Sequence, residues 1–189
     1  GNTYWVFDGY HSSLTRYAFN GDHGPGGADH SDGVITRYAE GLVKRVPRVA
    51  SNLQYDAQTN LLYVADTGNA RVAVLDTASG SMGGATFPNY DGCVQNKVNT
   101  ASVTTLIDGD EFGIQAPSGL VKRGDLLLVG DNATGHIHAF TADAERLDWM
   151  DTKVGPGTLN GIEMDPAGNL LITDTAKNSI YMISPLEGQ

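Results

Sequence analysis

The sequence is poor in cysteine, in charge and in long hydrophobic runs. Cys93 is the single cysteine among 189 residues, so the thiol is either buried and inert or bonded to another chain. Charged residues make up 18 % of the chain, against about 25 % in ordinary domains. No run approaches the ~20 apolar residues of a membrane-spanning helix, so we expect no membrane insertion.

Basic charge is especially scarce. Twelve Lys and Arg against 22 Asp and Glu give a net charge of −10, which disfavours contact with phosphate backbones, so no nucleic-acid partner is expected. The first residues, Gly1–Trp5, do not read as a secretory leader; this start fits a processed terminus and an excised piece equally well. The 40 % of apolar residues argues against disorder.

What the sequence does contain is glycine, 24 residues, and an internal repeat. In four segments an apolar strand ends in Asp, and the next strand opens with an aliphatic residue six positions later. These aspartates are Asp8, Asp66, Asp131 and Asp174. A short carboxylate can accept hydrogen bonds from the backbone N–H groups of the following turn. We therefore predict a structural role for all four, since an active site needs one copy and a scaffold needs several.

The repeat predicts an all-β protein, a β-propeller of four-stranded antiparallel blades of about 40 residues each. Four blade units are visible, at about residues 1–47, 48–115, 116–155 and 156–189 of a single domain. The first and last units have room for three strands each, which gives about fourteen strands in all. We therefore expect an incomplete ring, completed by another protein chain or by further blades of the same propeller.

Two segments carry a resemblance to a known family. Tyr63–Val72 (YVADTGNARV) closely resembles the core of an NHL repeat, and Asp165–Asp174 (DPAGNLLITD) is similar to the hairpin of NHL and gluconolactonase-like proteins. The resemblance covers most of residues 48–185, and more loosely 4–40. It implies a propeller of the six-bladed type and leaves the activity open, because this architecture hosts binders, hydrolases and lyases alike.

A glycine-rich inserted loop is the first candidate site. It contains two Asp-His pairs and one further carboxylate, namely Asp22, His23, Asp29, His30 and Asp32. Imidazole and carboxylate ligands suit zinc, and carboxylates with carbonyls suit calcium, so a divalent cation is one interpretation. His11 in the preceding turn is a further candidate ligand. The alternative is a solvated loop whose Asp side chains cap turns, since the spacing matches no specific zinc signature.

The starts of the innermost strands are the second candidate, because they line the central channel of a propeller. They are Ser51-Asn52, Ser118-Gly119 and Asn160-Gly161. The resemblance to gluconolactonase-like enzymes implies that Asn160 is a metal ligand. Those enzymes also need a Glu and an Asp from other blades, and no convincing match exists here; Glu163 faces either the channel or solvent. NHL-like amidating lyases place His at these inner positions, and this sequence does not.

Two further motifs complete the candidates. His136 and His138 share one strand face and either chelate a metal or form an ordinary exposed face. Asn132 begins an Asn-Ala-Thr glycosylation sequon on a predicted turn, which favours an extracellular or secreted protein. No motif supports a nucleophile, so no catalytic residue is assigned.

These patterns favour a non-enzymatic extracellular binding and assembly module, while leaving enzymatic activity open. It would contact a partner chain or ligand through loops 20–33 and 80–115 and through open strand edges. The alternative is a metal-dependent, gluconolactonase-like hydrolase with its site in the central channel.

Overall fold

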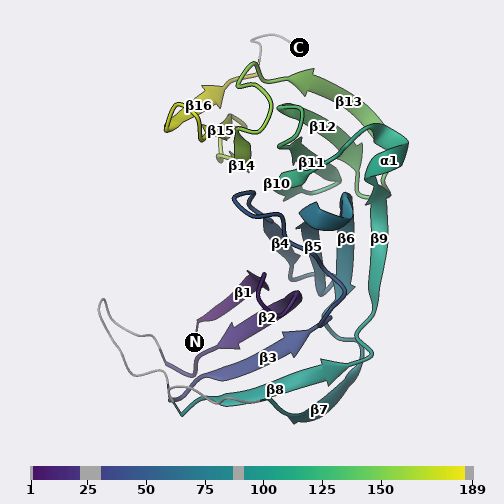
Figure 1. The fold of residues 1–189 in the computed structure, drawn as a ribbon, viewed down its shortest axis with the longest axis vertical. Coiled ribbons are helices and arrows are strands. Elements are labelled where there is room, and N and C mark those ends of the chain that lie inside the picture. Colours follow the sequence, from purple (N-terminus) through teal and green to yellow (C-terminus); the bar gives the residue numbers. More distant parts are fainter. Residues whose placement is uncertain (1, 22–30, 87–91, 186–189) are drawn as a thin grey trace.

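Four β-sheets follow one another along an arc that surrounds a central hollow and is open on one side (Figure 1). The computed structural model describes residues 2–21, 31–86 and 92–185. This is an all-β, incomplete β-propeller, as the repeat predicted. The described residues contain two short helical turns, η1 (Thr67–Asn69) and α1 (Gly109–Phe112). No helix among them is long and apolar enough to span a bilayer.

The sheets hold sixteen strands among the described residues. The first sheet has the order β1 (Thr3–Asp8), β2 (Ser13–Ala18), β3 (Val34–Tyr38), β8 (Val94–Asn99) and β7 (Ser81–Ala85). The second has β4 (Leu53–Asp56), β5 (Leu61–Asp66), β6 (Arg71–Asp76) and β9 (Val103–Asp108). The third has β10 (Pro117–Arg123), β11 (Leu126–Asp131), β12 (His136–Thr141) and β13 (Arg146–Asp151). The fourth has β14 (Leu159–Met164), β15 (Leu170–Asp174) and β16 (Ser179–Ile183).

The inserted segment after β6 differs from the expected loop in the unit 48–115. Its β7–β8 hairpin crosses back to the first sheet, where β8 pairs with β3 in parallel. The first sheet therefore has five strands instead of three, and one pairing is not antiparallel. Two forces account for the crossing: β3 offers an unpaired backbone edge, and Val98 of β8 packs against the core between the first two sheets.

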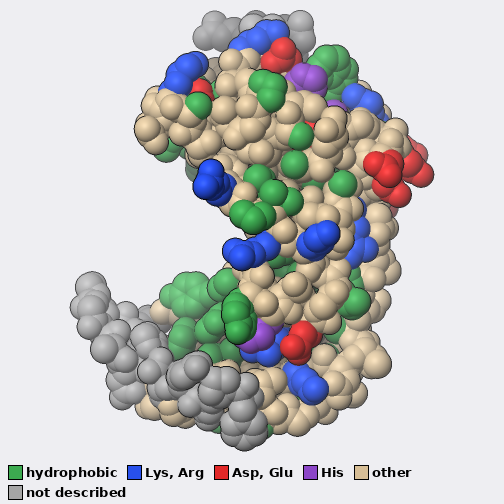
Figure 2. Space-filling model, in the orientation of Figure 1, with side chains coloured by type: hydrophobic (Ala, Val, Ile, Leu, Met, Phe, Trp, Pro, Cys, Tyr) green, Lys and Arg blue, Asp and Glu red, His purple; other side chains and the backbone are tan. Residues whose placement is uncertain are grey.

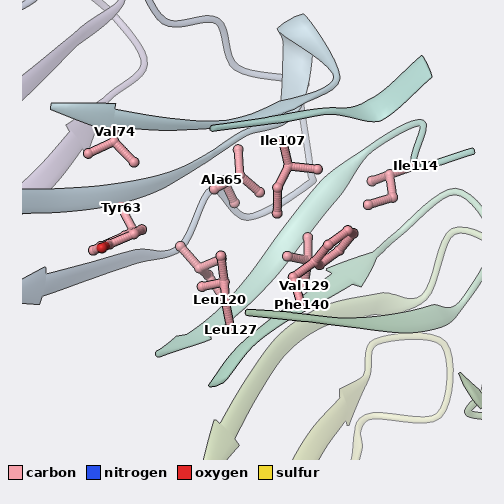
Figure 3. Packing of buried hydrophobic residues seen from close by; sticks show 10 residues of the cluster. Tyr63, Ala65, Val74, Ile107, Ile114, Leu120, Leu127, Val129 and Phe140 are labelled. Carbon is pink, nitrogen blue, oxygen red and sulfur yellow. The ribbon is translucent and has the colours of Figure 1, made fainter. Parts of the chain in front are cut away.

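The inner strands of the two middle sheets are buried on both faces. In β5, Leu62 and Val64 point into the core shared with the first sheet, while Tyr63 and Ala65 point into the core shared with the third. Figure 3 shows the second of these cores, where Phe140 and its neighbours from the third sheet meet the residues of β5, β6 and β9. A continuous apolar run in a strand is the pattern expected of two-sided burial, since neighbouring side chains point to opposite faces.

The repeated aspartates both close turns and link sheets. In the first and last sheets, Asp8 and Asp174 each accept two hydrogen bonds from backbone N–H groups of the following turn. Asp131 accepts one such bond from Ala133, and another from the N–H of Ala116, which precedes β10. The carboxylate thus joins the hairpin to the segment that leads into its own sheet.

Asp66 holds its turn through side chains instead. Its Oδ2 accepts hydrogen bonds from Asn69 Nδ2 and Arg71 Nε, both at 2.8 Å. Its Oδ1 accepts the N–H of Lys44, 2.7 Å away in the segment before β4. The side chain of Asp66 is fully buried, so the guanidinium of Arg71 balances a charge that has left water.

Candidate functional site

The segment that links β3 to β4 crosses the inner side of the arc. Val43 is buried in the core between the first two sheets and fixes the beginning of the segment. Lys44 is held at both backbone groups, since its N–H donates to Asp66 and its C=O accepts the N–H of Gly68 at 2.7 Å. The segment is therefore tied to the turn of the second sheet before it passes across the hollow.

Arg48 has a left-handed backbone conformation in this segment, with a φ of 70°. Such a φ is uncommon for a residue with a side chain and marks a position that the surroundings hold in place. The side-chain amide of Asn160, from β14, supplies this hold: its Nδ2 donates to the C=O of Arg48 (3.3 Å) and its Oδ1 accepts the N–H of Ala50 (3.1 Å). Asn160 therefore joins the fourth sheet to the segment that leads into the second sheet.

A cleft of about 600 Å³ lies between this segment, β1 and β4. We call it the inner cleft. Trp5, Phe7 and Leu53 contribute apolar surface, and Ser51, Asn52 and Gln54 contribute polar groups. Arg45, Arg48 and Glu163 bring charge to its lining.

The charge of the inner cleft differs from that of the whole chain. Arg45 and Arg48 are both exposed, and among the described residues no carboxylate lies within 4.0 Å of either guanidinium. Figure 2 shows Lys and Arg side chains along the hollowed inner side of the arc. In a chain of net charge −10, this is a local positive region.

The three pairs that were predicted to line a channel have different positions. Ser51 and Asn52 line the inner cleft, as does Glu163. Ser118 is fully buried and its Oγ donates to the C=O of Leu159 at 2.9 Å, which connects the third and fourth sheets. Asn160 bridges sheets as described above, and its Oδ1 also accepts a hydrogen bond from Asn132 Nδ2. Its role as a metal ligand stays a prediction.

The predicted loop site for a cation lies mostly outside the described residues, which leaves out Asp22, His23, Asp29 and His30. Asp32 is described, and its Oδ2 accepts the N–H groups of Asn20 and Gly21. His11 is hydrogen-bonded through Nδ1 to Asp8 Oδ2 at 2.6 Å. Within the described ranges no three His, Cys, Asp or Glu side chains are grouped so as to hold a metal ion.

The two histidines of β12 share a face, but their surroundings differ. The ring of His136 lies 4.8 Å from that of Trp149. His138 is 4 % exposed, and neither ring nitrogen has a hydrogen-bond partner in the part of the chain that the structure describes. Burial lowers the pKa of His138, with the nearby Arg146 charge adding to the effect and Asp131 opposing it. His138 is therefore buried and does not belong to an exposed strand face, which was one of the two interpretations of this pair.

The sequon asparagine is not on an accessible turn surface. Asn132 is 6 % exposed, and its Nδ2, the atom that a glycan would modify, donates to Leu159 O at 3.0 Å and to Asn160 Oδ1. The predicted accessibility is therefore corrected, because the side-chain amide bridges the third and fourth sheets instead of facing water. Cys93 is also buried, which agrees with the buried-thiol alternative.

The basic pair Arg45 and Arg48 is the feature that sequence reasoning missed. The signal was present, because three of the twelve basic residues fall within positions 44–48. It was overlooked because the segment lies between repeats, where no strand pattern assigns a direction to its side chains. Only the contacts of Asn160 and of Lys44 place the segment beside the inner cleft.

Comparisons with known proteins support the fold alone. No family model and no curated protein sequence matches the chain. Among solved structures, a luciferin-regenerating enzyme, which is a β-propeller, is similar with a TM-score of 0.53 and 14 % identity over 87 % of this chain. The chain spans half the length of that enzyme. A virginiamycin B lyase from Staphylococcus aureus matches over 98 % of this chain and 67 % of its own, with 13 % identity and a TM-score of 0.44.

Proposed function

We propose that this chain is a non-enzymatic binding and assembly module whose open sheet faces receive further propeller blades, from another chain or from the same propeller. An extracellular setting is part of the proposal, although the burial of Asn132 removes the sequon as support for it. The NHL-like character of the blades is likewise proposed from the sequence motifs in β5 and β15.

The apolar pattern of the two outermost sheets supports this proposal most strongly. In β16, Ile180, Tyr181, Met182 and Ile183 form a continuous apolar run. Such a run is typical of a strand covered on both faces, yet Ile180 is 70 % exposed and Met182 62 % exposed.

The first sheet repeats this pattern at the other end of the arc. In β1, Trp5 and Phe7 pack against the core, while Tyr4 and Val6 are exposed on the opposite face. Exposed apolar patches of this kind mark interaction surfaces.

Sedimentation equilibrium of the 189-residue chain tests the proposal. We expect species heavier than the 20.0 kDa monomer at micromolar concentration, because two uncovered faces favour association. The double variant Ile180→Lys/Met182→Lys should shift the population toward monomer. The matched control is Leu147→Lys, which changes an equally exposed residue of β13 on the third sheet. A compact monomer that the double variant leaves unchanged would overturn the proposal.

The alternative hydrolase requires a change at Asn160. A metal at this residue would need its Oδ1, which already accepts hydrogen bonds from Ala50 and Asn132. The proposed binding and assembly role leaves both hydrogen bonds of Asn160 Oδ1 intact, so these contacts favour that role over the hydrolase. Lactone hydrolysis that depends on added zinc or calcium and is abolished by Asn160→Ala would support the hydrolase instead.

A further inference from the structure

We propose that the inner cleft is a binding site for a small organic anion, a carboxylate attached to an apolar body, with Arg45 and Arg48 as the groups that recognise the charge. The inference does not depend on the assembly proposed above, although its residues include Asn160 and Glu163 of the fourth sheet beside those of the first two sheets and of the segment between them. It concerns a ligand, whereas the assembly concerns the outer faces of the end sheets.

The guanidinium groups of Arg45 and Arg48 have no carboxylate partner among the described residues. Five of the chain's basic side chains, Arg37, Arg71, Lys122, Lys153 and Lys177, form ion pairs among the described residues. Arg45 and Arg48 form none with any described residue, in a protein with an excess of ten negative charges. Guanidinium groups bind carboxylates through charge-assisted, often paired hydrogen bonds. Two of them beside one cleft therefore select an anion.

The surroundings position the backbone of Arg48 and the side chain of Arg45. Asn160 fixes the backbone on both sides of Val49, which holds Arg48 in its left-handed conformation. The side chain of Arg45 lies against Gly9, so closely that a Cβ added to Gly9 would be 2.5 Å from Arg45 Cδ. Holding the Arg45 side chain and the Arg48 backbone in advance reduces the conformational entropy that binding would otherwise cost.

The inner cleft also has an apolar wall beside the two arginines. Trp5, Phe7 and Leu53 line the same cleft as the arginines. The ring of Trp5 packs against the rings of Tyr38 and Tyr55, with centroid distances of 5.3 and 6.0 Å. A ligand with an aryl or alkyl body gains affinity from this wall, while inorganic phosphate or sulfate does not.

The carboxylate of Glu163, from β14, gives the binding test a further prediction, namely the direction in which its removal changes the affinity. It lines the cleft and repels an anion, so its removal should strengthen binding. If the ligand were a zwitterion, Glu163 would instead hold the ammonium group, and its removal would weaken binding.

Calorimetric titration with 4-phenylbutyrate, and with its neutral analogue 4-phenylbutanol, tests the inference on the wild-type chain. We expect 4-phenylbutyrate to bind with a Kd of about 0.1–1 mM and the alcohol at least about tenfold more weakly. Added NaCl should weaken the binding of the carboxylate and leave that of the alcohol unchanged. Equal affinity for the two compounds would overturn the inference.

Variants then locate the site. Arg45→Gln and Arg48→Gln should each weaken 4-phenylbutyrate binding about tenfold, while Glu163→Gln strengthens it. The matched control is Arg146→Gln, an exposed arginine of β13 on the outer strand of the third sheet. Binding that is the same in all the arginine variants, or a weaker affinity in Glu163→Gln, would contradict the assignment.

Gly9→Ala tests the position of Arg45 without changing any charge. The added methyl group would displace only the flexible Arg45 side chain, and Gly9 has no positive φ that an alanine would strain. We expect an affinity between those of the wild type and Arg45→Gln. Gly84→Ala, where the new methyl group meets nothing within 4 Å, is the control. Wild-type affinity in Gly9→Ala would show that Arg45 is not a ligand-binding group.

Discussion

The second and fourth sheets are built from similar hairpins but differ in how they are covered. Both contain strands with continuous apolar runs, Leu61–Asp66 in β5 and Ser179–Ile183 in β16. In β5 both faces are buried, because a neighbouring sheet lies on each side. In β16 the outward face is exposed. The end sheet therefore carries an apolar strand face that no sheet covers among the described residues, and the proposed assembly rests on this difference.

Truncation of core residues should give the largest contrast between the two sheets. Leu62→Ala in β5 removes a fully buried side chain and should lower the free energy of unfolding by about 2–5 kcal/mol. Met182→Ala in β16 should change it by less than about 0.5 kcal/mol at dilute concentration. Urea unfolding followed by tryptophan fluorescence measures both. Similar losses in the two variants would mean that β16 is covered in the dilute chain as well.

The turn aspartates should show the same contrast on a smaller scale. Asp131→Ala removes a fully buried carboxylate and leaves the N–H groups of Ala116 and Ala133 without their acceptor, which should cost about 2–4 kcal/mol. Asp8→Ala removes a partly exposed carboxylate of the first sheet and should cost about 1 kcal/mol. Thermal unfolding at pH 7 measures both values. A larger loss for Asp8 would contradict the view that the middle turns carry more of the structure.

His138 should make the middle of the arc sensitive to mild acid. Its pKa in the folded chain lies below the ordinary value of 6.5, chiefly because the ring is buried. The unfolded chain therefore binds the proton more readily, and stability is lost as the pH falls below about 6.5. His138→Leu should remove this part of the pH dependence. Above pH 7 the free energies of unfolding of the wild type and the variant should change with pH in the same way. Parallel curves across the whole range would show that His138 is not the titrating group.

Asp8 should have the smallest effect on the free energy of unfolding, and this effect should occur at a lower pH than that of His138. Burial raises the pKa of Asp8, but its hydrogen bonds with His11 and Tyr10 outweigh this, so the pKa lies below the ordinary 3.8. The stabilisation is present above about pH 4 and is lost as the pH falls through the lowered pKa. Asp8→Asn should therefore lose less stability than the wild type on acidification toward pH 3. Circular dichroism along an acid titration provides the measurement, and identical acid transitions would contradict it.

The repeat predicted the fold because its residues act through local interactions within each hairpin. An Asp after each apolar strand and an aliphatic residue six positions later specify a hairpin, and four such hairpins specify the sheets. The β7–β8 crossing could not be predicted, since residues 81–99 have no repeat partner and their pairing depends on the free edge of β3.

The candidate site was less predictable for a physical reason. Asn160 was identified from the family resemblance, but the hydrogen bonds that it forms depend on where residues 48–50 pass, more than a hundred positions earlier. Asn132 was interpreted from its tripeptide alone, and its burial follows from contact with the fourth sheet. Long-range contacts of this kind leave no local pattern in the sequence.

Hydrogen exchange measured by mass spectrometry, at low and high protein concentration, tests most directly the claim that the middle sheets are covered on both faces and the end sheets on one. We predict that amides of β5, β6, β11 and β12 exchange slowly at both concentrations. Amides of β1 and β16 should exchange quickly in dilute solution and slow down as the concentration rises. Slow exchange in all six strands in dilute solution, with no change on concentration, would contradict this account.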